Sequence, residues 1–107
     1  MKRRPVVRRW QAQQDIAQAL AWYEMEADAA VAQRFIDAVE AAIRHIAEFP
    51  ASGSPRYAPI VKMDGLRVWP LKRFPHLVFY IERGKRIDVW RVLHGERDIA
   101  AWLHEGE

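Results

Sequence analysis

The chain contains no cysteine among its 107 residues. This absence excludes disulfide bonds, a thiolate nucleophile and zinc sites that use cysteine ligands. The four histidines, at positions 45, 76, 94 and 104, lack the close spacing of common metal-binding motifs. We therefore expect no metal site and no other cofactor.

Long apolar runs are also missing. No run approaches the roughly 18 to 20 residues that cross a bilayer, and the basic N-terminus is followed by Gln and Asp instead of a signal-like apolar stretch. Gly-rich phosphate loops, nucleophile elbows and paired-carboxylate motifs are absent as well. We expect a cytoplasmic protein with no membrane partner, and the length fits a single domain, residues 1–107.

The net charge of the chain is +3, but positive and negative residues are concentrated in different segments. Residues 1–9 carry five positive charges and no negative ones, residues 10–50 carry two against seven carboxylates (−5), and residues 62–91 carry eight against three (+5). If the acidic part is helical and the basic part is sheet, the folded domain presents a basic face. Such a face attracts nucleic acid or an acidic protein segment, or serves only for solubility.

The first half of the chain predicts a strand followed by two helices. Residues Lys2–Trp10 alternate as a strand does, and a helical stripe runs from Asp15 to about Glu26. Asp28 is a candidate N-cap for a second helix that ends at Pro50, with Glu40 and Arg44 paired on its outer side. Its apolar residues recur every three or four positions: Val31, Phe35, Val39, Ile43 and Ile46. The two helices should form a hairpin with one common apolar face.

The second half predicts a loop over residues 51–64, three strands and a short closing helix, Glu96 to His104. The expected strands are Leu66–Leu71, Leu77–Glu82 and Ile87–Leu93, with a tight turn at Arg83-Gly84-Lys85. The fold class is thus α+β: a small antiparallel β-sheet packed against an N-terminal helical hairpin, in the order β-α-α-β-β-β-α. Both faces of the strands carry large apolar groups, and we expect a partner's helix or strand to cover what so short a chain leaves open.

The polar run Arg91–Asp98 closes the last strand and is the main candidate site. His94 suits an acid/base role there, or its ring bonds the neighbouring backbone or Asp98. Arg91 binds an anion or pairs with Asp88 or Asp98. Metal-free RNA cleavage would need at least two basic groups to converge on one phosphate. The aromatic residues are candidates for stacking on bases or for core packing: Trp69, Phe74, Phe79, Tyr80, Trp90 and Trp102.

Three segments carry a family resemblance: Gly65-Leu66-Arg67, Phe74–Tyr80 and, most specifically, Val89–Asp98. Together they resemble the ParE/RelE superfamily of type II toxin-antitoxin toxins, with the plasmid-stabilisation (ParE) branch the nearest. The resemblance implies a RelE/ParE-like fold and a toxin that inhibits growth until a cognate, ParD-like antitoxin wraps it in a hetero-oligomer. The ParE branch is similar to inhibitors of DNA gyrase, whereas the RelE branch cuts mRNA in the ribosome.

Residue matches favour the gyrase-directed branch. Where the mRNA-cutting branch places a strand arginine, this chain has Leu77, and its C-terminal segment has no tyrosine. The leading expectation is therefore a non-enzymatic toxin that binds gyrase. The alternatives are a ribosome-dependent endoribonuclease that uses Arg67, Arg91 and His94, and an inactive interaction module. The candidates for binding target or antitoxin are Arg67, Trp69, Trp90, Arg91, His94 and Arg97.

Overall fold

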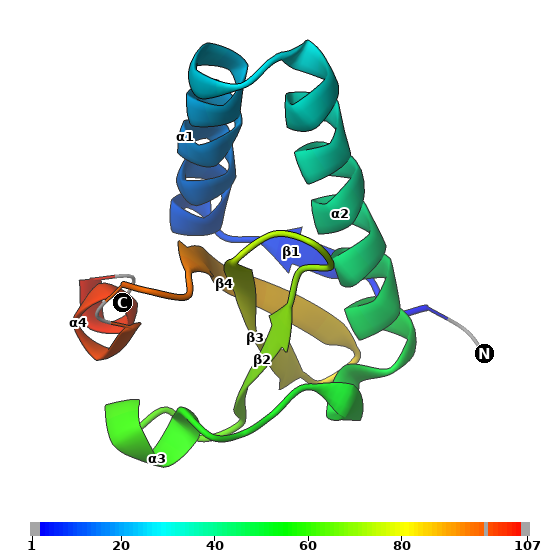
Figure 1. Cartoon of the computed structure of the whole chain (residues 1–107). Helices are drawn as coiled ribbons and strands as arrows, with labels where there is room; N and C mark the ends of the chain where they lie inside the picture. Colours follow the sequence, from blue (N-terminus) through cyan, green and yellow to red (C-terminus); the bar gives the residue numbers. More distant parts are fainter. Residues whose placement is uncertain (1–2, 98, 106–107) are drawn as a thin grey trace.

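The computed structural model describes residues 3–97 and 99–105 (Figure 1). Its elements are β1 (Val6–Arg8), α1 (Trp10–Glu26), α2 (Ala29–Glu48), a 3-10 turn (Pro50–Ser52), α3 (Ala58–Val61), β2 (Leu66–Pro70), β3 (His76–Arg83), β4 (Arg86–His94) and α4 (Ile99–Glu105). The predicted α+β class is confirmed. The element order is also as predicted, apart from α3, which lies in a segment that was expected to be loop.

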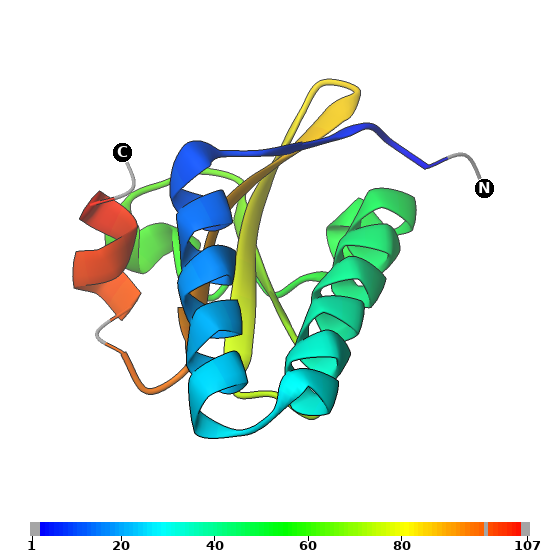
Figure 2. The ribbon, with the colours of Figure 1, turned by 90° about the horizontal axis from the view of Figure 1, so that it is seen from above.

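The strands form one sheet in the order β1-β4-β3-β2. β2, β3 and β4 are antiparallel neighbours, while β1 runs parallel to β4, so one pair departs from the expected antiparallel arrangement. The helical hairpin forms the crossover that a parallel pair requires, and Figure 2 shows α1 and α2 side by side across the sheet. The predicted tight turn is confirmed: Arg83 pairs with Arg86, and Gly84 adopts a positive φ of 58°.

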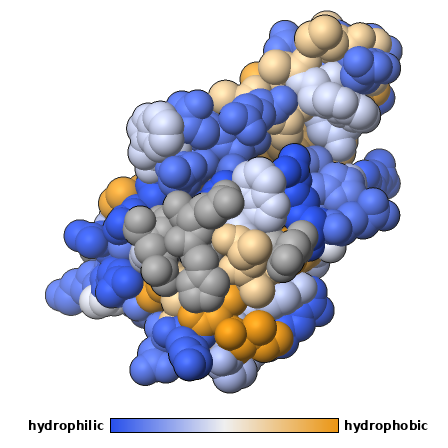
Figure 3. Space-filling view, turned by 90° about the vertical axis from the view of Figure 1, so that its left-hand side faces the viewer, coloured by the Kyte–Doolittle hydropathy of each residue, from blue (hydrophilic) through white to orange (hydrophobic). Residues whose placement is uncertain are grey.

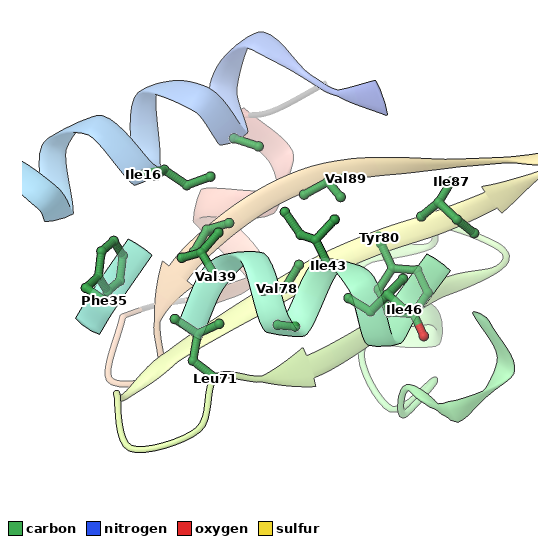
Figure 4. Packing of buried hydrophobic residues seen from close by; sticks show 13 residues of the cluster. Ile16, Phe35, Val39, Ile43, Ile46, Leu71, Val78, Tyr80, Ile87 and Val89 are labelled. Atoms are coloured by element: carbon green, nitrogen blue, oxygen red, sulfur yellow. The ribbon is translucent and has the colours of Figure 1, made fainter. Parts of the chain in front are cut away.

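The helical hairpin covers one face of the sheet and makes the first core. Four of the five stripe residues on α2 are buried as their spacing predicts, against Val78 and Tyr80 of β3 and Val89 of β4 (Figure 4), while Val31 in the first turn is only partly buried. Asp28 is the N-cap of α2, because its Oδ1 accepts a hydrogen bond from the Val31 N–H at 2.8 Å.

The first helix begins at Trp10, not at Asp15, and β1 is correspondingly short. Ala12 is fully buried one turn before Ile16, so the inward stripe extends further than its large residues indicate. Glu40, expected to pair with Arg44, instead accepts two hydrogen bonds from Arg8 of β1, at 2.7 and 2.8 Å.

The chain covers the second face of the sheet itself, contrary to the expectation that a partner would be needed there. Two short helices close it, with α3 and α4 at the lower left of Figure 1. Each short helix covers the sheet with only a few apolar side chains. These are Val61 of α3 and Ile99 and Leu103 of α4, and each is at most 6% exposed. The second core contains Val61, Leu66, Val68, Phe79, Ile81, Trp90, Leu93, Ile99 and Leu103.

Candidate functional site: a polar corner between α1, β4 and α4

A pocket of about 710 Å³ opens where α1 passes the end of β4 and the start of α4. Its polar and aromatic walls include Asp15, Trp22, Tyr23, His76, His94, Arg97 and Trp102. We call this region the polar corner. Figure 3 views the molecule from the side of α4 and shows a largely hydrophilic surface interrupted by a smaller apolar area.

Arg91 lies beneath the polar corner in a buried ion pair with Asp15. Its Nε and Nη2 donate to the two carboxylate oxygens, each at 2.8 Å, and its Nη1 donates to the Trp102 carbonyl at 2.7 Å. The side chains of Arg91 and Asp15 are only 3% and 9% exposed. Pairing with Asp88 was therefore the wrong prediction, and Asp98, the other proposed partner, lies outside the described residues.

The Asp15 carboxylate also accepts a hydrogen bond from the backbone of β4. β1 ends at Arg8, so within the described residues no strand lies beside Val92 at the outer edge of β4. The Val92 N–H instead donates to Asp15 Oδ2 at 2.9 Å. An N–H at a buried sheet edge needs such an acceptor. Sequence reasoning missed Asp15, although it lies on the inward stripe of α1, three residues after Ala12 and one before Ile16.

His94 closes the turn that follows β4. Its Nδ1 accepts the Glu96 N–H at 3.1 Å, and its carbonyl accepts the Arg97 N–H at 3.1 Å. The bond to the neighbouring backbone is as expected, and it implies that the proton of the neutral ring is on Nε2. The His94 ring is half-buried and lies 5.5 Å from that of His76.

His76 is the functional candidate that sequence reasoning did not find. Only 7% exposed, it packs against the rings of Tyr23 and Phe35. Burial, reinforced by the nearby His94 and Arg97, lowers the His76 pKa from 6.5 to about 4. Its Nδ1 has no hydrogen-bond partner among the described residues. A neutral, partly unsatisfied imidazole therefore borders the pocket at physiological pH.

Arg97 supplies the exposed cation of the polar corner. Its guanidinium lies over the Trp102 ring, 4.3 Å from the centroid, and Arg91 approaches the same ring at 5.5 Å. Such stacking restrains a guanidinium while leaving its N–H donors available. The corner is thus suited to binding an anionic or aromatic group.

The remaining candidates lie away from the polar corner. Arg67 Nη1 donates to the carbonyls of Gly53 at 2.7 Å and Ala51 at 3.2 Å, tying the loop after α2 to β2. Trp69 stacks on His45 with centroids 4.1 Å apart, and Trp90 belongs to the second core with 7% exposure. Of the six candidates, the corner gathers Arg91, His94 and Arg97.

Within residues 3–97 and 99–105, no group of three or more His, Asp or Glu side chains is placed to hold a metal ion. None of the helices formed by these residues is both long and apolar enough to cross a membrane.

Comparison with known proteins identifies the family. The family model that describes the ParE toxin of the parDE type II toxin-antitoxin system matches residues 6–99. A solved structure from the chromosomal ParDE system of P. aeruginosa is similar in fold, with a TM-score of 0.73 and 17% identity over 87% of this chain and 97% of that one. Among curated protein sequences, none matches.

Proposed function

Because the chain belongs to the ParE family of toxins from type II toxin-antitoxin systems, we propose that it arrests growth by binding DNA gyrase and that a cognate antitoxin neutralises it. The observation that carries the choice of a binding mechanism over RNA cleavage is the placement of the candidate nuclease residues. The Arg91 guanidinium donates to the Asp15 carboxylate and the Trp102 carbonyl. The Arg67 guanidinium donates to the Gly53 carbonyl in the loop after α2.

An RNA-cleaving site needs cations and a proton-transfer group that meet at one phosphate. Arg91 and His94 lie near one another on β4, but Arg67 acts on the loop beyond β2, and Arg91 is only 2% exposed. Arg97 remains as an exposed cation beside His94. This arrangement favours recognition of a protein or anionic group over RNA cleavage.

A supercoiling assay tests the proposed target. Purified toxin should inhibit gyrase at micromolar concentrations and leave a topoisomerase without gyrase subunits unaffected. Adding the cognate antitoxin before the toxin should restore supercoiling. Full supercoiling in the presence of toxin that is folded and arrests growth would exclude gyrase as the target.

The ribosome-dependent endoribonuclease remains the second candidate, because His94 and Arg97 share one pocket. Primer extension on cellular mRNA after toxin induction separates the two. Codon-linked cuts that disappear in His94→Ala would establish the nuclease, whereas intact mRNA during growth arrest supports the gyrase inhibitor. An inactive interaction module predicts no arrest at all.

The proposed antitoxin binds as a ParD-like partner in a hetero-oligomer, and both proteins act in the cytoplasm, where gyrase works. The candidate contacts with target or antitoxin are the exposed groups of the polar corner, above all Arg97 with His94. Co-expression with the antitoxin should relieve toxicity and yield a complex that co-purifies.

A further inference from the structure

A second polar feature lies at the opposite end of β4 from the polar corner. Asp88, 1% exposed, is approached by three arginines: Arg86 at 3.0 Å, Arg83 at 3.3 Å and Arg9 at 3.7 Å. These arginines come from the hairpin between β3 and β4 and from the residue after β1. We call them the arginine cluster. We propose that the arginine cluster and the adjoining N-terminal arm, residues 3–5, bind the phosphate backbone of duplex DNA.

The cluster carries more positive charge than its carboxylate offsets. Three guanidinium groups share one carboxylate, which leaves a local excess of two charges. The arginine side chains stay 44–54% exposed, so these charges reach the surface. Because Asp88 is buried in the strand, it holds the guanidinium groups near one another against their mutual repulsion.

Most donors of the cluster are unused. Among the described residues, only Arg86 Nε makes a hydrogen bond to Asp88, and the contacts of Arg83 and Arg9 are longer ion pairs. A guanidinium has five N–H donors in a planar fork that matches two phosphate oxygens. Arg9 also lies over the Trp90 ring, 4.7 Å from its centroid, which restrains its position.

The N-terminal arm extends the basic surface beside the hairpin. The Arg4 side chain donates to the Gly84 carbonyl at 3.1 Å and pairs with Glu82. Exposed Arg3 precedes it, and exposed Lys85 follows Gly84 in the turn. Figure 2 shows the arm and the hairpin at the same edge of the molecule. The surface then carries six basic residues (Arg3, Arg4, Arg9, Arg83, Lys85 and Arg86) against Glu82 and Asp88, an excess of four.

The excess of positive charge on the arginine cluster favours DNA over an acidic protein segment. A protein partner normally buries apolar anchors in its interface. Two pockets among the described residues, the polar corner and a hollow between α2 and β2, include no residue of the arginine cluster. Phosphates need only charge and donors. This inference does not depend on gyrase as the target, because it concerns direct contact with DNA.

A duplex is favoured over single strands because the cluster's own ring, Trp90, is only 7% exposed. Single-strand binders present open aromatic faces to unstacked bases. The 66% exposed Trp10, one residue after Arg9, would suit such a base, so single-stranded DNA is the competing ligand in the test.

The test is fluorescence anisotropy of a labelled 20-base-pair duplex titrated with toxin over a range of salt concentrations. Arg83→Gln/Arg86→Gln should weaken binding several-fold and reduce the slope of log K against log salt by about 1.8, as expected when two phosphate contacts are lost. Arg3→Gln/Lys85→Gln should weaken binding in the same way without disturbing the ion pairs of Asp88. Thermal melts establish that both variants are folded.

Arg34→Gln/Arg44→Gln is the matched control, since it removes two exposed arginines from α2. It should leave the affinity within about twofold of wild type, apart from the small long-range effect of net charge. Equal loss in the control and cluster variants would overturn the proposal. Single strands binding tenfold more tightly than the duplex, or polyglutamate binding where DNA does not, would also overturn it.

Discussion

Gly53 and Tyr80 hold the loop after α2 against the sheet through a shared hydrogen-bond arrangement. The Gly53 N–H donates to the Tyr80 hydroxyl at 2.9 Å, and that hydroxyl donates to the Pro50 carbonyl at 2.7 Å. A Cβ on Gly53 would lie 2.4 Å from the Tyr80 oxygen and 2.9 Å from the ring. The position therefore requires glycine because of close approach, not because of a positive φ.

Replacing Gly53 with alanine should lower the free energy of unfolding by about 1–3 kcal/mol, the usual cost of overpacking. Tyr80→Phe should cost about 1–2 kcal/mol, because it leaves buried backbone groups unpaired. The two losses should sum to more than the loss in the double variant, since removing the hydroxyl also removes the closest clash. Urea unfolding of the four proteins measures this coupling, and strictly additive losses would contradict the contact.

Removing Asp15 should destabilise the protein more than removing a surface carboxylate. Asp15→Ala removes the carboxylate that pairs with the buried Arg91 guanidinium and leaves the Val92 N–H without its acceptor, which costs about 3–5 kcal/mol. Asp15→Asn keeps an oxygen for Val92 and should cost less. Asp37→Ala on the exposed side of α2 is the control, and a similar loss there would show that the buried pair contributes little.

Stability should fall in mild acid because of His76. The His76 pKa is about 4 in the folded protein and about 6.5 in the unfolded chain, so the unfolded state takes up the proton first. The neutral His76 ring makes its full contribution to the free energy of unfolding above pH 6.5. This contribution is lost as the pH falls toward 4, by about 3 kcal/mol in total. His76→Phe should flatten this part of the profile in denaturant titrations. An unchanged slope in the variant would assign the acid sensitivity to other groups.

Loss of the N-cap of α2 should lower the free energy of unfolding by less than loss of Asp15. Asp28→Ala removes the acceptor for the Val31 N–H and should cost about 1 kcal/mol. Asp28→Ser keeps a capping oxygen and should retain most of the stability. Thermal melts of the two variants provide the measurement, and equal losses would indicate that capping is not the cause.

Arg97 should matter for function and not for folding. Its side chain is exposed and stacked on Trp102, so Arg97→Gln should leave the melting temperature nearly unchanged. If the polar corner contacts the target, the variant should need about tenfold more toxin for the same inhibition of supercoiling, the scale of one lost charged contact. Gln33→Ala on α2 is the control. Full activity of Arg97→Gln would place the target contact elsewhere.

Local patterns predicted those parts of the fold that depend on neighbours in sequence. The stripe on α2, the Asp28 cap and the turn at Gly84 each follow from residues a few positions apart, and all are present. The start of α1 was missed because alanine is a weak marker of burial, although Ala12 is fully buried. α3 was missed because its apolar residues are too few to show a period.

The candidate site was predictable only in outline. The turn formed by His94 is local, and its bond to the Glu96 N–H follows from adjacent residues. The partner of Arg91 lies 76 positions away on another element, where no sequence spacing points to it. The low His76 pKa likewise arises from burial between α1, α2 and β3, which only the packed structure reveals.

The parallel pairing of β1 with β4 has a consequence for synthesis of the toxin. Val6 pairs with Ile87, which lies far along the chain, so the first strand gains its partner only after β4 has been synthesised. The ion pair between Asp15 and Arg91 is equally late. Long-range closures of this kind slow folding. Until β4 has been synthesised, the nascent chain therefore lacks both the partner of β1 and the buried ion pair beneath the polar corner.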